Sequence, residues 1–253
     1  MIVPGLVSVT LRRHSVDEVA GLAAESGLRA IQWGGDVHVP VGDHAAARLA
    51  AARCSREGLE IEGYGSYYVA GGSDPGAFSD VVRTALALGA PRIRVWAGSA
   101  GSADVSPAVR TAIAGDLRRC ADAAARHGLT VAVEYHPDTL TDTPASARLL
   151  TDQVDHEAFE SYWQPGPGPD VRESHAEVVS LLPRLVGVHV FSWGPGGFTD
   201  RLALADHEPL WRKVFSELST DGGRRHALLE FVQDDAPRNL HRDAATLLTW
   251  LGS

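Results

Sequence analysis

The sequence predicts a single (β/α)8 TIM barrel that occupies residues 1–253 as one domain. Short strand-like apolar segments alternate with helical segments, and this alternation repeats eight times along the chain. A doubly wound open sheet uses the same alternation and is the alternative. The count of eight and the absence of a GxGxxG nucleotide-binding motif favour the barrel.

The elements follow one another as strand and helix pairs of similar length. The strand-like segments are 3–11, 29–35, 59–68, 92–98, 129–136, 158–165, 185–193 and 226–232. The helical segments are 15–27, 43–58, 74–89, 106–128, 143–153, 171–184, 207–219 and 238–252. Ser15 is a suitable N-cap and Gly27 a stop signal for the first helix. Two Gly/Pro clusters, 164–170 and 194–197, directly follow strands, as active-site loops do.

The composition argues against nucleic-acid-binding, membrane-spanning and secreted proteins. The net charge of −9 and the pI of 5.6 argue against nucleic acid as a partner, because a nucleic-acid binder needs a basic face. The sequence has no apolar stretch of membrane-spanning length, and its start lacks the basic residues of a signal peptide. Cys54 and Cys120 lie in helical segments outside any CxxC motif. We therefore expect a reduced, cytoplasmic protein that does not bind membranes.

Polar residues recur on one face of several strands. In a barrel, one strand face packs against the helices and the other fills the interior, and we assign the more apolar face to the helices. The interior sets are then Arg92, Arg94 and Trp96; Glu134 and His136; Tyr162 and Gln164; Gly187, His189 and Phe191; and Leu228, Glu230 and Val232. In the third strand, Glu62, Tyr64 and Ser66 form one set.

Three interior residues stand near the carboxyl ends of their strands, where barrel active sites form. They are Glu134, His189 and Glu230. Gln164 stands near the end of the sixth strand, which comes between the strands of Glu134 and His189. Carboxylate, imidazole and amide oxygen are ligands for one divalent ion such as Mn²⁺, Co²⁺, Mg²⁺ or Zn²⁺. The alternative is structural: each acid pairs with an arginine such as Arg94, and His189 is a hydrogen-bonded core residue.

Four motifs together resemble the xylose isomerase-like barrel superfamily, often labelled sugar phosphate isomerases/epimerases. They are "VAVEYHPDTLTDT" with Glu134, "VGVHVFSW" with His189, "ALLEFV" with Glu230, and "IQWGGDVHVP" with His38. The resemblance covers essentially the whole chain. It implies a divalent metal bound at the ends of strands five to eight. Carried over to this sequence, the ligands are Glu134, Gln164, His189 and Glu230.

The sequence departs from the family pattern at three positions. Gln164 stands where the usual ligand is an aspartate, and Pro167 replaces the histidine commonly found three residues later. Gly187 replaces the first histidine of the His-x-His motif in strand seven. A neutral amide is a weaker ligand for a hard cation than a carboxylate, so Gln164 either binds the metal weakly or contacts the substrate.

The resemblance implies an enzyme, a metal-dependent isomerase or epimerase that acts on a sugar or sugar-like polyol through an enediolate. Glu134 and Glu230 are the catalytic candidates for proton transfer, with pure metal ligation as the alternative. A metal-dependent lyase, dehydratase or C-glycoside-cleaving relative is a second interpretation. A non-catalytic sugar-binding barrel is a third. An abasic-site endonuclease is a fourth, which the missing zinc ligands and basic groove disfavour.

Further residues near strand ends are candidates for binding a small carbohydrate-like substrate. They are Trp33, His38, Tyr64, Arg94, Trp96, His136, Trp163, Trp193 and Arg201. Tyr67 is a further aromatic residue near a strand end. Aromatic faces suit a sugar ring, with core packing as their alternative role. His136 is also a candidate proton relay, and Arg94 either binds an anionic group or pairs with Glu62. The resemblance is compatible with assembly of the chain into a homo-oligomer.

Overall fold

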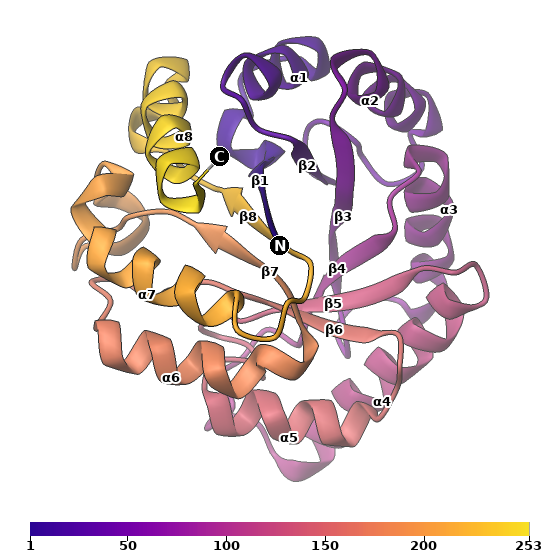
Figure 1. The fold of residues 1–253 in the computed structure, drawn as a ribbon. Coiled ribbons are helices and arrows are strands. Elements are labelled where there is room, and N and C mark those ends of the chain that lie inside the picture. Colours follow the sequence, from indigo (N-terminus) through magenta and orange to yellow (C-terminus); the bar gives the residue numbers. More distant parts are fainter. Residues whose placement is uncertain (253) are drawn as a thin grey trace.

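Residues 1–252 of the computed structural model form a closed barrel of eight parallel strands in the order β1 to β8. β8 pairs with β1 and closes the sheet, and the helices surround the strands (Figure 1). The predicted (β/α)8 fold is therefore confirmed. The strands are β1 Ile2–Val7, β2 Ala30–Gly34, β3 Glu60–Val69, β4 Arg92–Trp96, β5 Thr130–Glu134, β6 Phe159–Trp163, β7 Leu185–Val190 and β8 Arg225–Leu229.

One helix follows each strand. The helices are α1 Val16–Glu25, α2 His44–Glu57, α3 Phe78–Leu88, α4 Pro107–Ala125, α5 Pro144–Val154, α6 Val171–Leu181, α7 Glu208–Leu218 and α8 Pro237–Leu251. Short 3₁₀ turns are η1 Ser8–Leu11, η2 Pro75–Ala77, η3 Leu182–Arg184, η4 Gly197–Thr199, η5 Leu204–His207 and η6 Gln233–Asp235. Ser15 caps α1, as the sequence predicts, and the structure adds reciprocal hydrogen bonds between Ser15 and Glu18. Within residues 1–252, every helix is too short or too polar to span a bilayer.

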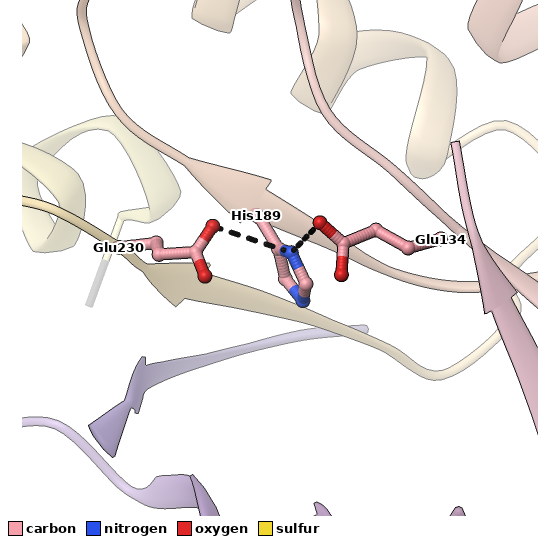
Figure 2. Close-up of side chains that lie close together, drawn as sticks. All are labelled: Glu134, His189 and Glu230. Carbon is pink, nitrogen blue, oxygen red and sulfur yellow. Dashed lines mark ion pairs between the residues drawn. The ribbon is translucent and has the colours of Figure 1, made fainter. Parts of the chain in front are cut away.

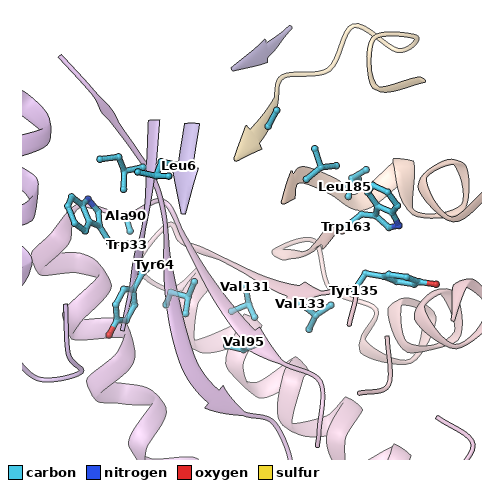
Figure 3. Close-up of a cluster of buried hydrophobic side chains, with 14 of the residues drawn as sticks. Leu6, Trp33, Tyr64, Ala90, Val95, Val131, Val133, Tyr135, Trp163 and Leu185 are labelled. Carbon is cyan, nitrogen blue, oxygen red and sulfur yellow. The ribbon is translucent and has the colours of Figure 1, made fainter. Parts of the chain in front are cut away.

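The hydrophobic core lies between the strands and the helices. Strand residues that point outward, such as Val131, Val133 and Trp163 (Figure 3), belong to one buried cluster with side chains of the helices. The alternation of β5 places Glu134 on the opposite, interior face. Burial of the outer face thus fixes the direction in which the polar side chains of the inner face point.

The barrel interior near the amino ends of the strands holds a charged layer. Glu62 is fully buried, and its carboxylate accepts hydrogen bonds from Arg92 Nη1 at 2.7 Å, Tyr162 Oη at 2.8 Å and Gln32 Nε2 at 3.1 Å. A buried carboxylate is tolerated when it is paired and hydrogen-bonded in this way. The partner of Glu62 is therefore Arg92, and the expected pairing of Glu62 with Arg94 is not formed.

A bulge in β3 reverses the faces expected for that strand. Ile31 of β2 pairs with Ile61, but Gln32 pairs with Gly63, so Glu62 is an extra residue. Beyond a bulge, successive side chains change faces. Glu62, Tyr64 and Ser66 therefore do not share a face, and the expectation that they do is wrong. Tyr64 packs in the outer core, while Tyr67 reaches the interior.

Candidate functional site

Three strands bring two carboxylates and an imidazole together inside the barrel. Glu134 ends β5, His189 lies in β7, and Glu230 directly follows β8. His189 Nδ1 lies 3.6 Å from Glu134 Oε1 and 3.4 Å from Glu230 Oε2 (Figure 2). One ligand atom from each residue falls within 4.8 Å of the others. The predicted cluster is thus assembled, because parallel strands place their carboxyl ends at one rim of the barrel.

Backbone contacts hold the two glutamates at the ends of their strands. Thr141 Oγ1 donates to the Glu134 carbonyl at 2.5 Å. The Glu230 amide donates to the Val190 carbonyl at 3.0 Å and so continues the pairing of β8 with β7. The next residue, Phe231, has a φ of 51°, a left-handed conformation that is rare for a bulky residue. This conformation lets Glu230 and Phe231, which are neighbours in sequence, both line the same cavity.

The charged groups of the cluster shift one another's pKa values. Burial would raise the pKa of Glu134, but the positive charges of Arg94 and His189 outweigh it and lower that pKa. Burial raises the pKa of Glu230, and the nearby charge of Glu134 adds to the rise. Burial would lower the pKa of His189, but the charges of Glu230 and Glu134 raise it. One imidazole and one guanidinium therefore face two buried carboxylates.

The donor set fits a divalent cation. Both ring nitrogens of His189 are buried and lack a hydrogen-bond partner among residues 1–252. A buried polar atom without a partner is costly unless a ligand or an ion satisfies it. Two carboxylates and one imidazole suit ions such as Mn²⁺, Co²⁺ and Zn²⁺. Gln164 lines the same cavity and is 6% exposed, which places its amide where it can serve as a further ligand or contact a substrate.

A cavity of about 450 Å³ opens above the cluster. Its lining combines a polar floor with aromatic walls. The lining residues are Val9, Arg12, Tyr67, Arg94, Trp96, Glu134, His136, Pro137, Gln164, Pro167, Trp193, Phe198, Glu230 and Phe231. A cavity of this size accommodates a small molecule and falls within the range of ordinary ligand sites.

Arg94 is the cation of the cavity wall. Its guanidinium lies 4.5 Å from the ring centre of Trp96 and 5.6 Å from that of Tyr67. Its Nε is 3.3 Å from Glu134 Oε2, an ion pair without good hydrogen-bond geometry. Nε and Nη1 are both buried and have no hydrogen-bond acceptor in the described part of the chain. Arg94 therefore offers unused donors to an anionic group in the cavity.

His136 has a defined tautomer. Its Nδ1 lies 2.5 Å from the carbonyl oxygen of Pro137, and its ring meets Trp96 edge-on at 4.9 Å. A carbonyl oxygen only accepts, so Nδ1 carries the proton and Nε2 of the neutral ring keeps its lone pair. His136 can therefore accept a proton from a bound molecule.

The structure places most of the predicted site residues at the cavity. Arg94, Trp96, His136, Gln164 and Trp193 line it together with the two glutamates. Arg201 stands behind the wall, with its guanidinium 4.2 Å from the ring centre of Phe198 and an ion pair to Asp235. Arg201 thus contacts the aromatic wall of the cavity.

Besides Arg201, four predicted substrate-binding residues lie outside the cavity. Trp33 points to the helices, and its Nε1 donates to Cys54 Sγ at 3.3 Å. Trp163 also belongs to the outer core, where its Nε1 donates to Glu177 Oε2 at 2.9 Å (Figure 3). Their positions follow from strand alternation, because each precedes or follows an interior residue by one position.

The other two are held by hydrogen bonds elsewhere. Tyr64 Oη donates to the Val39 carbonyl at 2.9 Å, a consequence of the bulge in β3. His38 is buried, with Nδ1 3.1 Å from Ser8 Oγ and Nε2 3.1 Å from the His14 carbonyl. These contacts indicate structural roles for both side chains.

Several cavity residues were missed at the level of sequence. Tyr67 reaches the site because the bulge changes the face of β3. Phe231 reaches it through its left-handed backbone, and Arg12 comes from the turn after β1. Arg12 Nη2 donates to Tyr67 Oη at 3.1 Å and so links the two walls. Only Tyr67 carried a signal, as one of the aromatic residues near strand ends.

The chain belongs to the xylose isomerase-like TIM barrel family, whose model matches residues 20–251. A segment of 84 residues is 37% identical to a 3-dehydroshikimate dehydratase of Bacillus anthracis. That segment covers 31% of this chain and 30% of the dehydratase. The chain thus matches about a third of the length of this curated relative.

Solved structures share the fold over the full chain. The probable 3-DHS dehydratase AsbF of Bacillus anthracis superposes with a TM-score of 0.81 at 20% identity, over 98% of each chain. A D-allulose 3-epimerase from Methylomonas sp. gives 0.75 at 13% identity, over 98% of this chain and 97% of that one. A xylose isomerase-like barrel protein from Mycobacterium smegmatis, solved in complex with magnesium, gives 0.69 at 17% identity, over 99% and 96%. At these identities the likeness shows a common fold.

Proposed function

We propose that the chain is a divalent-metal-dependent enzyme that removes a proton next to a substrate carbonyl. The observation that carries this proposal is the buried cluster of Glu134, His189 and Glu230 at the base of a small-molecule cavity. These three residues would hold the ion, with Gln164 as a fourth ligand or a substrate contact. Such an ion, when bound, polarises a carbonyl as a Lewis acid.

The chain supplies groups for proton transfer beside that position. Glu134 and Glu230 lie on opposite sides of His189 (Figure 2), so either carboxylate is placed to take or return a proton. His136 adds a third base, because its Nε2 keeps a lone pair and its ring lines the cavity. The aromatic walls would limit the access of water to the reacting carbon of a bound substrate.

Arg94 favours a substrate with a carboxylate and a flat ring. Its free N–H groups match a carboxylate, and the aromatic walls match an unsaturated ring better than a polyol. We therefore place the lyase interpretation first: dehydration of a cyclic hydroxy-ketone acid such as 3-dehydroshikimate, the substrate in the name of the Bacillus anthracis relative. A base takes the proton next to the carbonyl, the C–O bond of the hydroxyl on the adjacent carbon breaks, and the departing hydroxyl takes up a proton from the protonated base or the second carboxyl group and leaves as water.

The isomerase or epimerase expected from the sequence is the second candidate. Two carboxylates on opposite sides of one imidazole allow a proton to be removed and returned elsewhere on a sugar. Both candidates share the first proton abstraction. They differ in the group that follows: a hydroxyl leaves in the lyase, and a proton returns in the epimerase.

The test is a substrate panel with protein loaded with Mn²⁺, Co²⁺, Mg²⁺ or Zn²⁺. Dehydration of 3-dehydroshikimate gives a dihydroxybenzoate, which is followed by its ultraviolet absorbance. Ketoses such as D-allulose are followed by chromatography of the sugar products. Metal-dependent aromatic product supports the lyase, and metal-dependent sugar exchange supports the epimerase. If the metal-loaded protein binds sugars rapidly but converts no carbonyl substrate, both the lyase and the epimerase are contradicted. That result supports a sugar-binding protein.

A further inference from the structure

The imidazole of His189 lacks the outer hydrogen bond that usually orients a metal-binding histidine. Such histidines normally donate their second ring N–H to a carboxylate or a carbonyl. Here Nδ1 faces the two carboxylates, and Nε2 is buried without a hydrogen-bond partner among the described residues. The orientation of this ring therefore depends on another kind of contact.

Tyr162 of β6 supplies a stacked contact to that ring. The centres of the two rings are 5.2 Å apart and their planes differ by 25°. Tyr162 is fully buried, and its Oη lies 2.8 and 2.9 Å from the two carboxylate oxygens of Glu62. Glu62 is itself held by Arg92 at 2.7 Å. The tyrosine ring is thus fixed from below by the charged layer of the barrel interior.

Gly187 leaves the space that this tyrosine occupies. A Cβ at Gly187 would lie 3.2 and 3.3 Å from two ring carbons of Tyr162 and 3.1 Å from the His226 carbonyl oxygen. These distances are shorter than ordinary van der Waals contacts, so a side chain at position 187 would displace the ring. The Tyr162 ring and Gly187 therefore form one packing unit beneath His189, in which the ring uses the space that a side chain at position 187 would need.

We propose that Tyr162 is a positioning residue that holds His189 in its metal-binding orientation by ring stacking, with Gly187 providing the space. The inference rests on the metal site of the proposed function. A phenol ring that donates to a carboxylate is electron-rich, and it favours an imidazole that becomes more positive when it binds an ion. Loss of the outer hydrogen bonds that orient metal-binding histidines typically weakens metal binding about 10- to 100-fold, and loss of the stacked ring is expected to act in the same direction.

The experiment measures the dissociation constant of Mn²⁺ and the visible spectrum of bound Co²⁺ in the full chain. Tyr162→Leu is expected to raise the dissociation constant about 10-fold or more and to shift the Co²⁺ bands, because the imidazole loses its support. Tyr68→Leu is the matched control: Tyr68 is also buried and donates to a carboxylate, that of Asp116, away from the cluster. It is expected to change the constant by no more than about twofold.

Gly187→Ala tests the same unit from the other side, since its methyl group would press on the Tyr162 ring. Gly115→Ala is its control, because a Cβ at Gly115 has no neighbour within 4 Å. Melting of the metal-free variants separates general loss of stability from loss of ligand orientation. Unchanged affinity and Co²⁺ bands in every folded variant at positions 162 and 187 would overturn the inference while the metal site stands. A wild-type chain that binds no ion would overturn the proposed function itself.

Discussion

Replacing Arg94 by methionine separates substrate recognition from metal binding. Arg94 is 4% exposed, lines the cavity and has two nitrogens without hydrogen-bond acceptors in residues 1–252. A hydrogen bond to a charged group contributes about 1.5–3 kcal/mol. A carboxylate held by two such bonds therefore loses about 3–6 kcal/mol in the Arg94→Met variant. At 1.36 kcal/mol per factor of ten, kcat/KM falls about 10²- to 10⁴-fold.

The same substitution acts in the opposite direction on the metal. Arg94 Nε lies 3.3 Å from Glu134 Oε2, so its charge competes with a cation for that carboxylate. Arg94→Met should leave the metal dissociation constant unchanged or lower it. The assay compares steady-state kinetics on 3-dehydroshikimate with metal titration of the same preparation. Arg94→Lys is the control, which keeps the charge but not the planar pair of donors.

The result that refutes this reasoning is specific. If Arg94→Met keeps wild-type kcat/KM on a carboxylate substrate, Arg94 does not bind the carboxylate. If activity and metal affinity fall together, Arg94 supports the cluster instead of the substrate. In either case the preference for an acidic ring substrate over a neutral sugar loses its basis.

Three further predictions concern stability. Mn²⁺ at 100 times its dissociation constant should stabilise the protein by about 2.7 kcal/mol, or about 5–10 °C in calorimetry, and Glu230→Gln should abolish this gain. Burial raises the folded pKa of Glu230 above its unfolded value. The metal-free protein should therefore lose stability relative to Glu230→Gln as the pH rises through that folded pKa. Urea unfolding of both proteins at about pH 5 and about pH 8 measures this change in their relative stability. Trp33→Phe should cost about 1–3 kcal/mol in urea unfolding yet leave kcat/KM unchanged, since Trp33 lies outside the cavity, and a large loss of activity would contradict that placement.

The sequence predicted the parts of the site that depend on alternation within one strand. Glu134, His189 and Glu230 meet because each occupies an interior position near the end of a regular strand. Alternation also places Arg94 and Trp96 correctly, since β4 pairs without interruption with β5. The roles of these residues in metal and substrate binding stay predictions.

The missed residues depend on contacts between distant segments. The bulge that turns Tyr67 into the barrel is a matter of register between β2 and β3, which no local pattern reveals. The left-handed Phe231 has its amide held by Thr10 Oγ1 at 3.1 Å, across more than 200 residues of sequence. Trp33 and Trp163 are of a residue type that suits sugar binding, but they pack in the outer core because their strand positions face the helices.

Metal content of the purified chain tests the central claim most directly. Wild type and Glu134→Ala/Glu230→Ala are treated with chelator, dialysed against excess Mn²⁺ or Co²⁺, separated from free ion and analysed by elemental mass spectrometry. The account predicts close to one ion per chain in wild type and none in the folded double variant. Wild-type protein that keeps no ion under these conditions would contradict the account.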